Sequence, residues 1–296
     1  MKLDHCLDYY SQQGLITSPG SYQDLLAQFP TEIAELCERI NETILIDFIV
    51  NMGLVSVPAE HLDDIQLRKI ADKLAKIVSR NGTDRPEAAN YEKCLLGNCR
   101  DLSLMVCSVL RNQQVPARVR SGFATFFDQQ KYFDHWLCEY WNQQEERWIK
   151  VDCWMSQIQY RQEILPPELS GGLLELDYNP YDVKEQHFIT GGQAWVNCRE
   201  HGDNPDLYGT YEEFLKGSWF IRDNMLRDLL CLNQLEPLPW DCWGLMGREN
   251  SQIESGELVV LDEIAGFLNQ AVFTETTLAE QLARLHIKEA VLASLN

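Results

Sequence analysis

Apolar residues recur at helical spacing through the first third of the chain. In residues 31–50 they lie three or four positions apart, at Ile33, Leu36, Ile40, Ile44 and Phe48. In residues 61–80 the same spacing is found at Ile65, Ile70, Leu74 and Ile77. This spacing predicts two amphipathic helices, the first capped by Thr31. Residues 81–90 contain Gly, Pro and Asn, which predicts a loop.

The pattern changes after Gly97, where a run of about four helical turns begins at residue 99. Runs with strand character follow, rich in β-branched and aromatic residues, at 115–127, 135–141 and 147–154. The polar stretch 142–146 between the last two predicts a hairpin loop. One helix followed by an antiparallel meander predicts an α+β fold and not a parallel βαβ sheet.

Glycine and proline are scattered through residues 155–215, which predicts irregular structure and short helices there. Helical patterns return at 212–234, 257–272 and 277–295. We therefore expect one domain with three parts. Residues 1–85 form its helical N-terminal part, residues 86–160 form the α+β core, and residues 161–296 form a C-terminal extension packed on that core.

The composition limits the class of partner. The chain has 45 acidic and 25 basic residues, giving a net charge of −20, a field that repels nucleic acid and anionic membranes. Apolar runs fall far short of the ~20 residues of a membrane helix, and residues 1–15 lack the pattern of a signal peptide. The ten cysteines form no CxxC pair and no zinc pattern. We expect a cytoplasmic protein without cofactor or metal.

Three residues have the chemistry of a thiol enzyme. Cys99 opens a predicted helix, where backbone N–H groups favour the thiolate. His135 lies in the second strand run, and Asp152 closes the third. A histidine can accept the thiol proton, and a carboxylate can fix the orientation of the imidazole. If the two strands are neighbours in a hairpin, these side chains can meet on one face.

The same segments resemble the transglutaminase-like superfamily over residues 90–155. The residues that fit the nucleophile segment are Gly97, Cys99, Asp101, Leu110, Arg111, Pro116, Ala117, Arg118, Gly122 and Phe123. Those that fit the histidine and acid segments are His135, Glu139, Trp148 and Asp152. Two positions depart from the family pattern: Trp136 directly follows the histidine, and Cys153 follows the acid. Residues 200–247 also resemble an extension found in a bacterial subset of these proteins.

The resemblance implies a papain-related α+β core, in which a helix bearing the cysteine packs on an antiparallel sheet. It assigns Cys99 as nucleophile, His135 as base and Asp152 as the orienting acid. Asp101 and Glu139 are interpreted as structural. The implied reaction is acyl transfer at an amide or thioester carbonyl of a peptide, protein or small amide.

Several functions are compatible with this assignment. Hydrolysis, as in a peptidase or amidase, is favoured over amide-bond formation with an amine, since no calcium-loop pattern such as DxDxDG occurs. Peptide N-glycanase-like deglycosylation lacks support, because this sequence has no CxxC zinc pairs of the kind that those proteins carry. A non-catalytic domain that binds peptides is a further alternative. Residues 156–215 are a candidate lid over the cleft.

Overall fold

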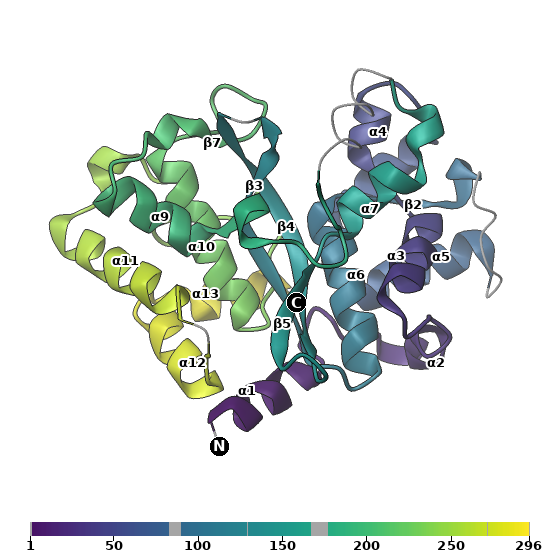
Figure 1. Ribbon diagram of the computed structural model, residues 1–296, viewed down its shortest axis with the longest axis horizontal. Helices are drawn as coiled ribbons and strands as arrows, with labels where there is room; N and C mark the ends of the chain where they lie inside the picture. Colours follow the sequence, from purple (N-terminus) through teal and green to yellow (C-terminus); the bar gives the residue numbers. More distant parts are fainter. Residues whose placement is uncertain (1, 83–89, 129, 167–176, 271, 296) are drawn as a thin grey trace. The chain divides into compact units, whose positions relative to one another are not determined.

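The computed structural model describes residues 2–82, 90–128, 130–166, 177–270 and 272–295 (Figure 1). The fold contains helices and a mainly antiparallel sheet, so the α+β prediction is confirmed. Two compact units can be distinguished, each built from separate stretches of chain. Unit 1 contains Met1–Tyr9, Val119–Trp136 and Lys184–Asn296, and unit 2 contains Tyr10–Arg118 and Leu137–Val183. The predicted boundaries at 85 and 160 stay a prediction.

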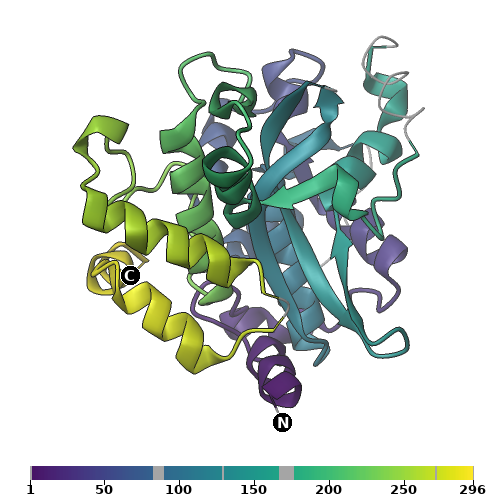
Figure 2. The ribbon, with the colours of Figure 1, turned by 60° about the vertical axis from the view of Figure 1, so that its left-hand side comes forward.

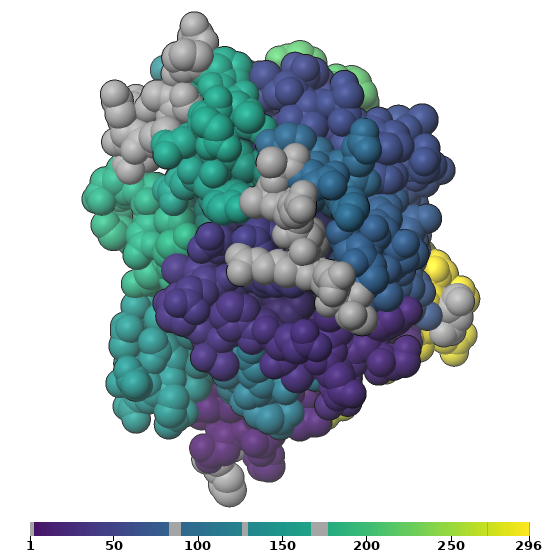
Figure 3. Space-filling model, turned by 90° about the vertical axis from the view of Figure 1, so that its right-hand side faces the viewer, coloured from purple at the N-terminus to yellow at the C-terminus, as the bar shows by residue number. Residues whose placement is uncertain are grey.

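Unit 2 begins with short helices, α1 (Lys2–Ser11, which starts in unit 1), α2 (Gln23–Leu26) and α3 (Ile33–Thr43). The predicted helix over 31–50 is wrong after Thr43, where strand β1 (Ile44–Ile46) and helix α4 (Asp47–Asn51) follow. The predicted cap is also wrong. Glu32, not Thr31, caps α3 by accepting a hydrogen bond from the Glu35 amide. These N-terminal segments, purple and blue, cover much of the face shown in Figure 3.

Strand β1 pairs in parallel with β2 (Leu95–Gly97). Helix α5 (Ile70–Asn81) begins later than the predicted helix over 61–80, whose first residues form a 3-10 helix instead. Helix α6 (Cys99–Asn112) confirms the helix predicted from residue 99. The loop predicted over 81–90 falls largely on residues 83–89, which lie outside the described residues.

The larger sheet has the strand order β5-β4-β3-β6, with β7 also paired to β4. Its strands are β3 (Ala117–Asp128), β4 (Lys131–Asn142), β5 (Arg147–Val151), β6 (Phe188–Thr190) and β7 (Tyr208–Gly209). In unit 2, β4 and β5 form the predicted antiparallel hairpin, with Cys138 opposite Val151. Burial, followed by the neighbouring Cys107 thiol, raises the pKa of Cys138, which places α6 against β4.

The third strand run ends earlier than predicted. Helix α7 (Cys153–Tyr160) starts directly after Asp152 and packs against α3 and α6. Cys153 therefore lies in the first turn of a helix, and the predicted strand run over 147–154 is wrong at its last residues. Of the candidate lid segment 156–215, residues 167–176 lie outside the described residues.

The C-terminal part of unit 1 is helical. It contains α9 (Gly191–Glu200), α10 (Ser218–Leu232), α11 (Ser255–Leu268), α12 (Glu275–Ala283) and α13 (Lys288–Leu295). Helix α9 packs against both α10 and α11 (Figure 2). Helix α10 starts later than predicted because Gly217, at φ 95°, ends the turn that follows β7. In the described part of the chain, no helix combines the length and the apolar character needed to cross a membrane.

Candidate functional site

Cys99 is the first residue of α6 and is partly exposed. Asn98 caps the helix: its side chain accepts a hydrogen bond from the Asp101 amide, and the Asp101 carboxylate accepts one from the Asn98 amide at 3.2 Å. This reciprocal capping box holds the first turn rigidly in place. The first-turn amides of a helix have no acceptor within that helix, so they favour negative charge nearby. The local sequence thus gives Cys99 surroundings that suit a thiolate.

Two buried cations support the capping box from behind. Asp101 is fully buried, and its Oδ1 lies 3.0 Å from Lys73 Nζ and 3.0 Å from Arg100 Nη1. Burial lowers the pKa of Lys73, while Asp101 opposes that shift. The predicted structural role of Asp101 agrees with these contacts, since its carboxylate joins α5 to the start of α6.

Gly97 allows α6 to start close to β1. A Cβ atom at this position would lie 2.9 Å from Ile44 Cγ2 and 3.1 Å from Asp101 Cβ. Contacts this short force neighbouring atoms to move. Glycine at position 97 is therefore required by close packing, and it keeps Cys99 at the end of β2.

Asp152 caps α7 and is fully buried. Its Oδ1 accepts a hydrogen bond from the Met155 amide at 2.9 Å, and its Oδ2 accepts one from Tyr178 Oη at 2.6 Å. Its own amide donates to the Pro180 carbonyl at 2.7 Å. The carboxylate is thus held in a fixed orientation. Tyr178 was not found from the sequence, because nothing in its local pattern points to a distant carboxylate.

We expect Tyr178→Phe to lower the free energy of unfolding by about 1–3 kcal/mol, the range for a buried hydrogen bond to a charged group. The phenylalanine keeps the ring but leaves Asp152 Oδ2 without this donor. Urea unfolding of wild type, Tyr178→Phe and the partly exposed control Tyr22→Phe measures the effect. Equal unfolding midpoints for all three proteins would contradict it.

His135 lies on β4 within unit 1 and is 3% exposed. The preceding residue, Asp134, accepts a hydrogen bond from Asn224 Nδ2 at 2.7 Å, and Asn224 also donates to the Gly122 carbonyl at 3.0 Å. Burial raises the pKa of Asp134, although Arg227 opposes the shift. Helix α10 therefore fixes the part of β4 that carries the histidine.

The three predicted residues are divided between the units. Cys99 and Asp152 begin helices α6 and α7, which pack against each other in unit 2. His135 belongs to unit 1. The meeting of all three side chains therefore stays a prediction. Within the described ranges, no three histidine, cysteine, aspartate or glutamate side chains are grouped as metal ligands would be.

Other residues that carry the family resemblance have structural roles. Arg118 Nε donates to Glu139 Oε2 at 2.7 Å, and its guanidinium lies 4.1 Å from the centre of the Trp148 ring. Arg111 is fully buried and donates to the Ala117 carbonyl at 2.9 Å. These contacts join α6, β3, β4 and β5 in unit 2, and they explain the residue types without invoking catalysis.

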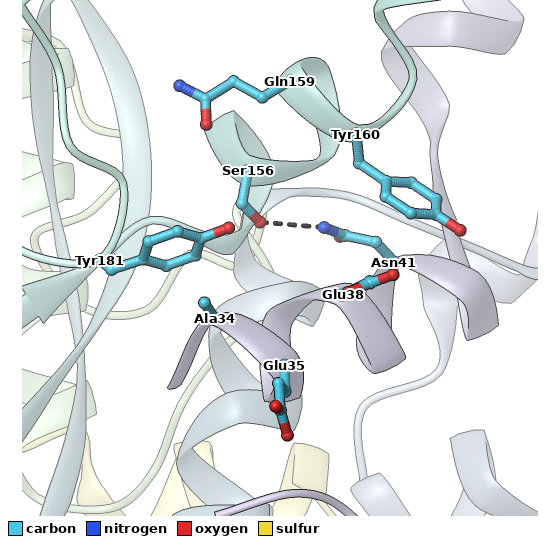
Figure 4. Close-up of a pocket in the computed structure, with 8 residues that line it drawn as sticks. All are labelled: Ala34, Glu35, Glu38, Asn41, Ser156, Gln159, Tyr160 and Tyr181. Atoms are coloured by element: carbon cyan, nitrogen blue, oxygen red, sulfur yellow. Dashed lines mark hydrogen bonds between the residues drawn. The ribbon is translucent and has the colours of Figure 1, made fainter. Parts of the chain in front are cut away.

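A pocket of about 190 Å³ lies between α3 and α7 (Figure 4). Its base includes a hydrogen bond of 2.9 Å from Asn41 Nδ2 to Ser156 Oγ, and its sides include Tyr160 and Tyr181. Burial, followed by nearby thiol and carboxylate groups, raises the pKa of Tyr181 to about 12. Sequence reasoning did not predict this pocket, because its lining comes from three distant segments.

A protein-family model agrees with the core described above. Residues 61–153 match the family model described as "Transglutaminase-like superfamily". This part of the chain is similar to the transglutaminase-like core. The match includes Cys99, His135 and Asp152, and it ends at the first residue of α7. The resemblance drawn from residues 90–155 is thereby confirmed, and the similarity extends back to residue 61.

One solved structure is similar to the chain, a protein from Cytophaga hutchinsonii named "Putative Cysteine Protease". The two sequences are 15% identical, with a TM-score of 0.26. The matched region covers 49% of this chain and 40% of that one. No curated protein matches the sequence.

Proposed function

We propose that the protein is a cysteine hydrolase that cleaves an amide or thioester bond through a thioester on Cys99. The transglutaminase-like match supports cysteine-based catalysis in general. The observation that carries the proposal is the position of Cys99 as the first residue of α6, partly exposed and held by the Asn98–Asp101 capping box. A core cysteine such as Cys107, buried in mid-helix, has none of these features.

His135 is the proposed base. It takes the proton from the Cys99 thiol, and the thiolate attacks the carbonyl carbon. The C–S bond forms, the C–N bond of an amide breaks, and the imidazolium gives its proton to the leaving amine. Water then attacks the thioester, His135 takes a proton from it, and the acid leaves as the thiolate is restored. First-turn amides of α6 are the proposed donors to the oxyanion.

Asp152 is proposed to orient His135. Strand pairing supports this role, since Asp152 directly follows Val151, the partner of Cys138, and His135 precedes Cys138 on the same strand by three residues. The bonds from Met155 and Tyr178 fix the Asp152 carboxylate. A buried carboxylate that cannot rotate is well suited to hold an imidazole in one tautomer.

We expect Cys99 to be alkylated by iodoacetamide faster than every other cysteine at about pH 6, because a thiolate–imidazolium pair persists where ordinary thiols are protonated. His135→Ala should slow this reaction about 10- to 100-fold. Mass spectrometry of labelled peptides between about pH 5 and 9 measures each site. His201→Ala, which removes an exposed histidine, is the matched control.

Two outcomes would count against hydrolysis. If Cys99 reacts no faster than buried Cys107 or Cys138 at any pH, the peptide-binding scaffold becomes the better explanation. If Cys99 is reactive and peptide amides are converted to hydroxamates by hydroxylamine but not to acids by water, amide-bond formation with an amine replaces hydrolysis. Both measurements, of alkylation and of product formation, use the full chain, and the Cys99→Ser variant serves as the control without the thiol.

A further inference from the structure

Two helices begin side by side at one edge of the small sheet in unit 2. Strands β1 and β2 are parallel, with Ile46 opposite Gly97. Strand β1 runs directly into α4 at Asp47, and β2 runs through Asn98 into α6 at Cys99. Paired strands lie about 4.8 Å apart and rise about 3.3 Å per residue. The first residue of α4 is therefore a close neighbour of the segment that bears the candidate nucleophile.

Asp47 has an acidic side chain in an environment that disfavours its charge. It is largely buried, and the groups that favour its ionised form are its own amide and that of Phe48. In the described ranges, no lysine or arginine forms an ion pair with it. Burial, followed by the nearby Asp101 carboxylate, raises the pKa of Asp47 to about 6.

Several other charged groups around this edge form pairs with one another. Lys73 of α5 and Arg100 of α6 both bind Asp101. Asp64 accepts a hydrogen bond from the Leu96 amide of β2 and forms an ion pair with Arg80. On the elements packed against α6, the pairs are Arg39 with Glu42 and Tyr178 with Asp152. None of these contacts supplies a counter-ion to Asp47.

Helix capping does not account for this residue. An aspartate in the first turn of an exposed helix stabilises it through the helix dipole. Here burial and Asp101 outweigh that effect, so the carboxyl group takes up a proton at a higher pH than an ordinary aspartate does. A carboxylate in this condition beside a reactive group is typical of a functional site.

We propose that Asp47 is a positioning residue that sets the reactivity of Cys99 through its charge. The ionised carboxylate raises the free energy of the Cys99 thiolate, and protonation of Asp47 removes that repulsion. The inference rests on the proposed function, because it assigns a regulator to the same thiol. The repulsion therefore acts on the thiolate near neutral pH and is lost in mildly acidic conditions, where Asp47 is protonated.

The test is the rate of Cys99 alkylation by iodoacetamide in wild type, Asp47→Asn and Asp47→Glu. At about pH 7.5 the Asn variant should react about three- to tenfold faster, the effect of removing one charge at several ångströms. At about pH 5, where wild-type Asp47 is largely protonated, the two rates should converge. The Glu variant should restore the wild-type profile.

The controls separate this inference from the proposed function. Asp63→Asn removes an exposed carboxylate and should match wild type throughout. Asp47→Ser, which also removes the charge and suits a helix start, replaces the Asn variant if circular dichroism shows that it is unfolded. Equal rates in wild type and a folded charge-free variant at about pH 7.5, with the His135 dependence intact, would overturn the role of Asp47 alone. If His135→Ala left the rate of Cys99 alkylation equal to that of wild type, the proposed function would be overturned instead.

Discussion

Asp101→Asn is expected to lower the free energy of unfolding by about 3–5 kcal/mol, the range for removing one partner of a buried ion pair. The asparagine keeps the shape of the side chain but leaves Lys73 and Arg100 without their shared anion. Lys73 is fully buried, and it cannot reach water without opening the contact between α5 and α6. Urea unfolding followed by circular dichroism measures the loss.

A matched control lies on the same helix as the lysine. Asp72 is exposed in the first turn of α5, and Asp72→Asn should change stability by less than about 1 kcal/mol. The double variant Lys73→Met/Asp101→Asn should recover part of the loss, because an apolar side chain needs no counter-ion. A loss below about 1 kcal/mol for Asp101→Asn alone would show that the buried cations find other partners.

Gly122→Ala is expected to destabilise unit 1 by about 3 kcal/mol, the upper end of the usual range for overpacking. The added Cβ would lie 2.2 Å from the Ile189 carbonyl oxygen and 2.6 Å from Phe188 Cζ. Both groups belong to β6, which pairs with β3 at this point. The neighbouring strand must therefore move, and backbone atoms cannot rotate away as a long side chain can.

Gly256→Ala is the control for this substitution. A Cβ at Gly256, in the first turn of α11, meets no atom within 4 Å. Alanine there should stabilise the helix by up to about 1 kcal/mol. Thermal unfolding of the two variants should therefore shift in opposite directions. Equal melting temperatures for Gly122→Ala and wild type would show that β6 separates from β3 without loss.

Sequence reasoning succeeded where local pattern and final structure agree. Helix α6 starts at Cys99 because Asn98 and Asp101 form a cap that local sequence alone specifies. It failed where pairing with a distant segment decides the structure. Residues 44–46 continue the apolar spacing of α3, yet they become a strand because β2, some 50 residues later, offers a parallel partner.

The candidate site shows the same limit. Cys99 could be found from its place at a helix start, and Asp152 from its place after a strand run. Asp47 was interpreted as part of a continuous helix, so its place directly after the residue that pairs with Gly97 was hidden. Tyr178 binds Asp152 across 26 residues, a contact that no periodicity encodes.

The interleaved composition of the two units affects how the chain folds during synthesis. All of unit 2 is present once Val183 has been made, whereas unit 1 also needs residues 184–296. Until then Arg120, buried in the finished protein, lacks the Asp228 carboxylate that it binds at 2.8 Å across 108 residues. Because domains generally fold as units during translation, unit 2 should fold first on the ribosome. The β3 and β4 residues of unit 1 would then complete their packing only after α10, which carries Asp228, has emerged.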